Sequence, residues 1–405
     1  MAQELPLADV KILDLMWVMA GPAGSRILAD YGATIVRVES ARRIDTARTL
    51  MPFHNRRPGP DSSALFQNLN AGKLGVTLDL TKEAGRAVVR DLVRWADVVT
   101  ESFSPRAMRG WGLDYESLRK IKPDLIMLSS CLMGQSGPWA KFAGFGNLAA
   151  AISGFFNLAG WPDRAPAGPF GAYTDYVSPK FTALAILAAL DHHRRTGQGQ
   201  YIDQSQAEAS LHFLGPALLD YTANGRVQGG IGNRDLNYAP HGIYPAAGTD
   251  CWIAIATEND QQWQALCSVL GRPEFLTDDR FSSLTARLAH QDELDEAIAA
   301  WTKARDRFQA EALLQARGVP AGAVRTIHEL YTDPQLAHRQ HFVRLGHTTL
   351  EAVTVEGSRF RLSRTPAQVR TSAPTFGRDN QHVLESILGY NEERITELVA
   401  AGALE

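Results

Sequence analysis

The chain has 405 residues, of which 45% are hydrophobic and 21% are charged, values typical of a globular protein. A chain of this length exceeds one hydrophobic core, so it predicts two domains, or one large and one small domain. The 41 basic and 44 acidic side chains give a net charge of -3, which favours neither a nucleic-acid partner nor a membrane surface. The expected partners are a small molecule or another protein chain.

The cysteines and histidines indicate neither disulfides nor a bound metal. Cys131, Cys251 and Cys267 are too few and too scattered for a disulfide framework or a zinc site, which fits a reducing compartment. His192 and His193 are adjacent and would point to different sides of a helix. No signal segment and no apolar run long enough to cross a bilayer is found. We therefore expect a cytoplasmic protein with no metal.

The first elements predict a parallel sheet. Residues 10–15 form an expected buried strand, a turn with Gly21 and Gly24 follows, and then come a helix at 25–31 and a strand at 33–39. This order is typical of a doubly wound α/β domain, whose loops bind ligands at the strand ends. The turn lacks the three-glycine dinucleotide fingerprint, which disfavours a nicotinamide cofactor. Further strands are expected at 74–80, 97–100 and 125–130, with helices at 81–95, 113–118 and 206–221.

An arginine-rich loop follows the second strand, at residues 40–63. Guanidinium groups gathered on one ordered loop suit phosphate recognition, since each can donate two parallel hydrogen bonds. A solvated basic surface loop explains the same residues equally well. Lys73, just before the next strand, is a further candidate phosphate contact. The arginines of the loop are Arg42, Arg43, Arg48, Arg56 and Arg57.

Asp175 lies where a long Ala- and Leu-rich helix is predicted to begin. Unpaired backbone N–H groups and the positive end of the helix dipole favour an ionised carboxylate there. An ionised and fixed carboxylate can act as a nucleophile. Aspartate is also one of the commonest helix caps, so position alone leaves both roles open.

The second half of the chain predicts a small domain. Gly229, Gly230 and Gly232 form a glycine-rich segment that suits either a mobile lid or an ordinary linker. A strand at 253–256 and polar helices as far as residue 317 follow. After them we expect strands around Val353 and Phe360. The predicted domains are a large α/β domain whose N-terminal part is 1–224, a smaller α/β domain at 225–330, and a C-terminal part at 331–405 that returns to the large domain.

A series of motifs runs in order along nearly the whole chain: Leu13-Asp14-Leu15, Ala20-Gly21-Pro22, Leu28 to Ala33, Val36 to Glu39, Asn70 through Lys73 to Leu80, Ala96 to Val99, Gly134 to Pro138, Thr196 to Gln200 and Gly318 to Ala321. With them the chain resembles the class III CoA-transferases, the family of formyl-CoA transferase, carnitine CoA-transferase and alpha-methylacyl-CoA racemase. The run from Gly168 to Tyr176 is similar to the succinyl-CoA:benzylsuccinate branch.

The resemblance implies a fold and a reaction. Asp175 matches the family nucleophile, which attacks an acyl-CoA thioester to give a mixed anhydride and then an aspartyl-CoA thioester. The partners would be an acyl-CoA and a free carboxylic acid, so that coenzyme A is a substrate and no cofactor is permanently bound. The implied fold is a large Rossmann-like domain made from both chain ends with a smaller domain, in an interlocked, ring-shaped homodimer.

The resemblance also implies positions for the residues around the substrate. The Gly229 to Gly232 segment would form a loop over Asp175. Trp17 and Met19 stand where formyl-CoA transferase has His and Gln, so we expect a larger or more apolar acyl group than oxalate or formate. The residues expected to contact CoA are Val18, Met19 and Ala20 near the thioester, and Arg42, Lys73, Phe103 and Arg106 near the nucleotide.

Two other functions stay open. Racemisation needs an acid and a base on opposite faces of the substrate, but the run Ala143-Gly144-Phe145-Gly146 lacks the histidine of the racemases. Of the two residues that racemisation needs, only the acidic one has a counterpart here, Glu258. Racemisation is therefore the second enzyme hypothesis. The third is a non-catalytic subunit paired with a homologous active chain; the presence of Asp175 argues that this chain is the catalytic one.

Overall fold

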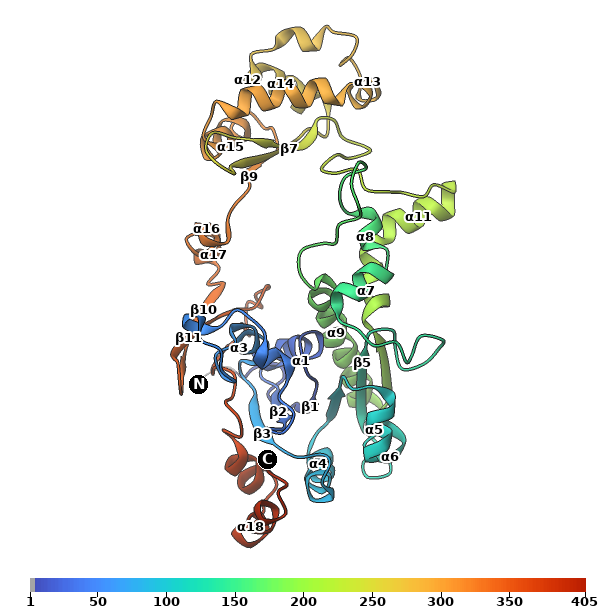
Figure 1. Cartoon of the computed structure of the whole chain (residues 1–405), viewed down its shortest axis with the longest axis vertical. Coiled ribbons are helices and arrows are strands. Elements are labelled where there is room, and N and C mark those ends of the chain that lie inside the picture. Colours follow the sequence, from blue (N-terminus) through green and yellow to red (C-terminus); the bar gives the residue numbers. More distant parts are fainter. Residues whose placement is uncertain (1–3) are drawn as a thin grey trace. The chain divides into compact units, whose positions relative to one another are not determined.

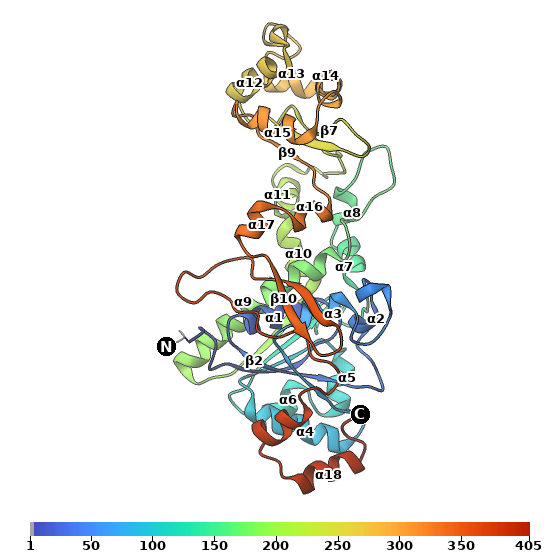
Figure 2. The ribbon, with the colours of Figure 1, turned by 90° about the vertical axis from the view of Figure 1, so that its left-hand side faces the viewer.

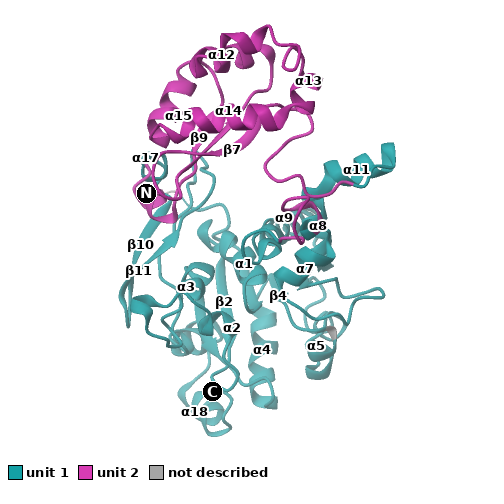
Figure 3. Cartoon of the chain, turned by 45° about the horizontal axis from the view of Figure 1, so that its top comes forward, with its two compact units in different colours: residues 1–156, 168–227, 334–405 teal, residues 157–167, 228–333 magenta. Residues whose placement is uncertain are grey.

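The structure is a computed structural model, and the residues described here are 4–405 (Figure 1). The chain divides into two compact units (Figure 3). The large unit contains the chain up to Phe156 together with Gly168–Val227 and Pro334–Glu405. The small unit contains Asn157–Ala167 and Gln228–Asp333. Each unit is therefore assembled from segments that lie far apart in the sequence.

The large unit is built on a six-stranded parallel sheet with strand order β3-β2-β1-β4-β5-β6. This confirms the predicted α/β class and the parallel sheet. The strand order reverses between β1 and β4, and ligands of doubly wound sheets bind beyond the carboxyl ends of the strands at such a point. The strands are β1 (Lys11–Leu15), β2 (Thr34–Glu39), β3 (Leu74–Thr77), β4 (Val98–Glu101), β5 (Ile126–Cys131) and β6 (Tyr201–Ser205).

Helices cover both faces of this sheet, because alternate strand residues point to opposite sides. Leu13 and Leu15 pack with α4 (Glu83–Trp95) in one core. Ile12 packs with α1 (Ala20–Asp30) and α9 (Tyr173–Thr196) in the other. The remaining helices up to residue 224 are α2 (Thr46–Thr49), α3 (Ala64–Asn70), α5 (Pro105–Trp111), α6 (Tyr115–Leu118), α7 (Gly146–Ile152), α8 (Phe155–Leu158), α10 (Gln206–Leu211) and α11 (Gly215–Asn224).

The sequence predicted a single helix over 206–221, and the structure has two. A 3-10 turn, His212–Leu214, separates α10 from α11. Pro216 lies in the first turn of α11, where its missing N–H group is tolerated. A continuous helix would have required that N–H group, so the proline explains the break.

The C-terminal segment returns to the large unit (Figure 2). It forms the antiparallel hairpin of β10 (Phe342–His347) and β11 (Glu351–Glu356), a π-helical stretch at His382–Ile387 and α18 (Glu392–Ala400). The expected strand near Val353 is confirmed, whereas the one near Phe360 is wrong. Phe360 lies outside the strands and stacks on Tyr31 at 4.9 Å between ring centres, so its aromatic character serves packing.

The small unit has a three-stranded antiparallel sheet in the order β7-β8-β9. Its core is formed by residues such as Ile253, Ile255 and Trp263 between the sheet and the helices. The strands are β7 (His241–Pro245), β8 (Trp252–Ala256) and β9 (Ala321–Ala323); the helices are α12 (Asp260–Leu270), α13 (Leu284–Ala289), α14 (Gln291–Lys303), α15 (Arg307–Gln315) and α16 (Ile327–Tyr331), and α17 (Pro334–His338) follows in the large unit.

Residues 157–167, which the sequence assigned to the large domain, cluster with the small unit. The backbone N–H of Gly232 donates to the carbonyl of Gly160 at 2.7 Å. Asn157 donates from its side chain to the carbonyl of Gln228 at 3.3 Å. These contacts join two segments about 70 residues apart in the chain, so no local sequence pattern announces them.

Candidate active site

Asp175 lies in the first turn of α9 and is only 7% exposed. The N-cap of this helix is Ala172, which makes no side-chain capping bond. The helix therefore begins close to where the sequence predicted it, but Asp175 is not its cap. The Asp175 carboxylate is therefore available for a role other than helix capping.

Two groups donate to the Asp175 carboxylate, and Thr174 links them. The side-chain amide of Gln206 donates to Asp175 Oδ1, and the backbone N–H of Gly146 donates to the same carboxylate. Gln206 also donates to the hydroxyl of Thr174 at 2.9 Å, which in turn donates to the carbonyl of Gly146 at 2.9 Å. Four residues thus form one closed hydrogen-bonded ring around the carboxylate.

Gly146 is required by close approach to Asp175. A Cβ atom at position 146 would lie 2.7 Å from Asp175 Cγ and 2.8 Å from each carboxylate oxygen. Real contacts of this kind are longer than 3.0 Å. Glycine is therefore the residue that lets the carboxylate lie against the start of α7.

Burial raises the pKa of Asp175 to about 6, against the two hydrogen bonds from Gln206 and Gly146, which lower it. The expectation that the helix start makes this carboxylate more acidic is therefore wrong, because desolvation outweighs the local donors. Asp175 takes part in none of the ion pairs found among residues 4–405. At pH 7 most molecules still carry the ionised, poorly hydrated carboxylate that a nucleophile needs.

The turn between β1 and α1 is held almost entirely by side chains. Val18 has φ 68°, a left-handed conformation that is rare for a β-branched residue. Met19 is the N-cap of α1 and Ala20 its first residue. The side-chain bonds are Met16 N–H to Asp14 Oδ1 at 2.9 Å, Arg37 Nη1 to the Met16 carbonyl at 2.6 Å, Trp17 N–H to Ser102 Oγ at 2.9 Å and Val18 N–H to Asp45 Oδ1 at 3.0 Å.

Trp17 meets Phe103 at the point where the strand order reverses. Their ring centres lie 5.5 Å apart in an edge-to-face arrangement, and Phe103 makes a similar contact with Trp111 at 5.2 Å. The indole N–H of Trp17 donates to the carbonyl of Val38 at 3.3 Å. Trp17, Val18 and Phe103, far apart in the sequence, therefore lie together beyond the ends of β1 and β4.

Lys73, the predicted phosphate contact, is occupied by protein partners in this structure, which does not favour that role. Its side chain is fully buried, and its ammonium donates to Asp14 Oδ2 at 2.9 Å. Burial would raise the pKa of Asp14, but Lys73 and Arg37 outweigh it and keep that pKa below its ordinary value. The other acceptors within 3.0 Å of Lys73 are the Pro22 carbonyl, Ser25 Oγ and Asn70 Oδ1.

The arginine-rich loop is divided between the interior and the surface. Arg48 is fully buried and pairs with Glu39 at 2.6 Å, so it is unavailable to a phosphate. Arg42 keeps 56% of its side chain exposed beside Glu405, and Arg106 on α5 is exposed as well. Arg42 and Arg106 remain candidate nucleotide contacts.

The glycine-rich segment belongs to the small unit and is packed. A Cβ at Gly230 would lie 2.8 Å from the Gly160 carbonyl, and one at Gly232 would lie 2.8 Å from the Trp161 ring. Gly229 has open space around it. Glu258 is exposed after β8. Close packing at two of the three glycines fits neither a free linker nor an open loop.

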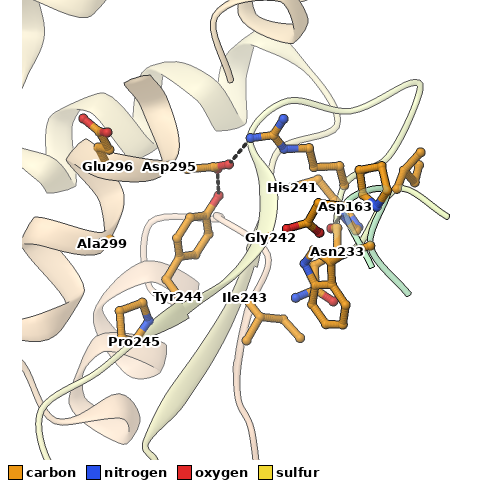
Figure 4. Close-up of a pocket in the computed structure, with 14 residues that line it drawn as sticks. Asp163, Asn233, His241, Gly242, Ile243, Tyr244, Pro245, Asp295, Glu296 and Ala299 are labelled. Carbon is orange, nitrogen blue, oxygen red and sulfur yellow. Dashed lines mark hydrogen bonds and ion pairs between the residues drawn. The ribbon is translucent and has the colours of Figure 1, made fainter. Parts of the chain in front are cut away.

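A pocket of about 680 Å³ lies within the small unit (Figure 4). Arg234 in this pocket contacts Asp292 and, at 3.1 Å, Asp295. The Tyr244 hydroxyl donates to Asp295 at 2.8 Å. Because two carboxylates already neutralise Arg234, it is a poor phosphate ligand, and we read these contacts as holding the 231–234 segment onto α14.

Among the described residues, no cluster of three or more histidine, cysteine or acidic side chains is arranged to hold a metal ion. Within the same part of the chain, no helix combines the length and the apolar character needed to cross a membrane.

Gln206 and Gly146 are the site residues that sequence reasoning missed. Gln206 follows directly after β6, at the carboxyl end of the sheet, where ligands bind in doubly wound folds. That position was the one available signal. Neither a glutamine nor a glycine by itself predicts contact with a distant carboxylate, and Gln206 lies 31 positions from Asp175.

The profile of CoA-transferase family III matches residues 7–380. The chain belongs to this family. It is 34% identical to succinyl-CoA–D-citramalate CoA-transferase from Chloroflexus aurantiacus, over 98% of this chain and 97% of that protein. It is 33% identical to succinate–glutarate CoA-transferase from Agrobacterium fabrum, over 94% and 96% of the two chains.

A crystal structure of a CAIB/BAIF family protein from Brucella suis has a TM-score of 0.87 to this fold, with 31% identity over 95% of this chain and all of that chain. Other relatives carry the names of alpha and beta subunits of succinyl-CoA–L-malate CoA-transferase. The protein is thus an enzyme of the family III CoA-transferase class, whose substrates are a CoA thioester and a carboxylate.

Proposed function

We propose that this enzyme moves CoA from an acyl-CoA to a free carboxylic acid through two covalent intermediates on Asp175. An Asp175 oxygen attacks the thioester carbonyl carbon, the C–S bond breaks, and the CoA thiolate leaves with the electron pair. The thiolate then attacks Asp175 Cγ, and the donor acid leaves as a carboxylate. The acceptor acid reverses both steps and departs as the new CoA thioester, so no other reactant is consumed.

The observation that carries this proposal is the environment of Asp175. The carboxylate is 7% exposed, has a pKa raised to about 6 by burial, and accepts hydrogen bonds from Gln206 and Gly146. A cap or a structural ion pair would need neither this burial nor a glycine at position 146. A buried carboxylate without a cationic partner costs stability, which favours a catalytic reason for it.

We propose succinyl-CoA as the donor and an acid with an apolar portion as the acceptor. The names of the Chloroflexus aurantiacus and Agrobacterium fabrum relatives given above include succinyl-CoA or succinate. The ring of Trp17, packed edge-on against Phe103, supports an apolar wall for the acyl group beside Val18 and Met19. Arg42, Phe103 and Arg106 are the proposed nucleotide contacts.

We further propose that the enzyme works as a homodimer of interlocked chains. Tyr176, Leu184 and Leu187 on α9 are between 41% and 61% exposed. No residue of α11 is buried, and its Leu219 is 67% exposed. A helix with this much exposed apolar surface is typical of a protein–protein interface, and a second copy of the chain is the occupant we propose. Light scattering coupled to size exclusion tests this: a monomer contradicts the dimer, and co-purification of a homologous chain supports the heteromeric alternative.

The test of the reaction is mass spectrometry of the enzyme incubated with a panel of acyl-CoAs that includes succinyl-CoA. Trapping with hydroxylamine or borohydride should place a modification on Asp175, and Asp175→Ala should show none. Exchange of the substrate α-proton into deuterated water without any adduct would instead support racemisation, with Glu258 the first residue to change. That outcome is not expected, because Phe145 precedes Gly146 beside the carboxylate and cannot carry a proton.

A further inference from the structure

The second half of the reaction needs an oxyanion site at Asp175 itself. When the thiolate attacks Cγ of the anhydride, the Asp175 carbonyl oxygen becomes an oxyanion until the Cγ–O bond to the departing acid breaks. Donors that already point at this oxygen stabilise the transition state without reorganisation. This requirement follows from the proposed function, on which the present inference rests.

We propose that the Gln206 side-chain amide forms this oxyanion site, with the Gly146 N–H as a second donor to the same carboxylate. Gln206 Nε2 already donates to Asp175 Oδ1, which leaves Oδ2 as the attacking oxygen of the first step. Oδ1 then becomes the carbonyl oxygen of the anhydride and carries the negative charge when the thiolate adds to Cγ. One donor therefore serves the free carboxylate and the later oxyanion at the same atom.

Gln206 is held rigidly enough for this role. Its side chain is 7% exposed, and the Nε2 group also donates to Thr174 Oγ1 at 2.9 Å. It is the first residue of α10, directly after β6, and the Ser210 hydroxyl donates to its carbonyl at 2.9 Å. A donor fixed by a strand end, a helix and a neighbouring hydroxyl needs little adjustment during the reaction.

The structure also supplies a matched control. Gln204 lies two residues earlier on β6 and is buried to a similar degree, at 8% exposure. Its amide donates to Ser178 Oγ at 2.9 Å and accepts from Thr182 at 2.8 Å. Loss of the Gln204 amide therefore removes comparable buried hydrogen bonds without removing a donor to Asp175.

The experiment measures the two covalent steps separately, by rapid quench and mass spectrometry with succinyl-CoA. In Gln206→Met we expect conversion of the anhydride into the aspartyl-CoA thioester to slow by about 10²- to 10³-fold, the loss seen for one oxyanion donor. The anhydride should accumulate, while KM for succinyl-CoA changes little. Gln206→Asn, which keeps a polar side chain but is one methylene too short, should show the same defect.

Gln204→Met should keep the wild-type ratio of the two rates, whatever its effect on stability. Equal ratios in Gln206→Met, Gln206→Asn and wild type would overturn the inference while leaving the proposed function intact. Absence of any adduct on Asp175 in the wild-type enzyme would instead overturn the proposed function, so the two failures are distinguishable.

Discussion

Replacing Asp175 with asparagine should make the protein more stable at neutral pH and abolish the covalent intermediates. Asparagine has nearly the same shape and keeps an oxygen that accepts from Gln206. It removes the charge that burial disfavours, since the wild-type carboxylate has a pKa raised to about 6 from 3.8. A catalytic group held at a cost to the fold is a common source of stability–activity trade-offs.

The magnitude follows from the pKa difference between the folded and unfolded states. Because the folded protein binds this proton more tightly than the unfolded chain, the stabilisation is fully present below pH 4 and is lost as the pH rises through 6. The whole effect is about 3 kcal/mol, of which about 1.4 kcal/mol is lost between pH 5 and pH 8. Asp175→Asn should therefore gain stability relative to wild type over this interval.

Denaturant unfolding of both proteins at pH 5, 6, 7 and 8 measures this difference directly. The control is Asp191→Asn on the same helix, an exposed carboxylate paired with Arg195 at 2.8 Å, whose effect should stay within about 0.5 kcal/mol at every pH. A constant or falling stability difference between Asp175→Asn and wild type from pH 5 to pH 8 would refute the argument that burial raises the pKa of Asp175.

Three further predictions concern residues of the large unit. Gly146→Ala must push the Asp175 carboxylate away by about half an ångström, so kcat should fall about 10- to 100-fold. The control is Gly215→Ala, at the first residue of another helix with open space around it, which should leave kcat unchanged. Equal kcat values for the two variants would contradict the packing argument. Lys73→Met leaves Asp14 buried and unpaired, so the free energy of unfolding should fall by about 3–5 kcal/mol, a loss that a surface phosphate ligand would not show. The pH profile of kcat/KM should have an acid limb near pH 6, from Asp175; a limb near 4 would mean that Asp175 is not desolvated.

Periodicity and turn residues were sufficient to predict the parallel sheet and the helix that begins near Asp175. The strand at Lys11–Leu15 and the helix Tyr173–Thr196 agree with the predicted elements to within a few residues. Apolar runs and helix-terminal residues are local signals, so they can be recognised in the sequence without knowledge of the fold. The break at Pro216 was equally local, and the single helix predicted over 206–221 failed because that signal was not used.

The environment of each charged side chain was not predictable in this way. Lys73 and Arg48 lie in stretches that are typical of phosphate-binding surfaces, yet both are fully buried in ion pairs. Burial depends on which segments pack over a residue, and Arg48, for example, donates to the carbonyl of Pro374, 326 positions away. Charge and spacing alone cannot separate a ligand contact from a structural ion pair.

By itself, the sequence determined the class of fold and the family and pointed to Asp175 as the proposed nucleophile, because these depend on residue patterns that are continuous or strictly ordered along the chain. Only the tertiary structure decided that Gly146 and Gln206 enclose Asp175 and that desolvation raises its pKa to about 6. Hydrogen bonds and desolvation act over a few ångströms, and the residues that supply them here are 29 and 31 positions from Asp175. Folding alone brings them to the same carboxylate.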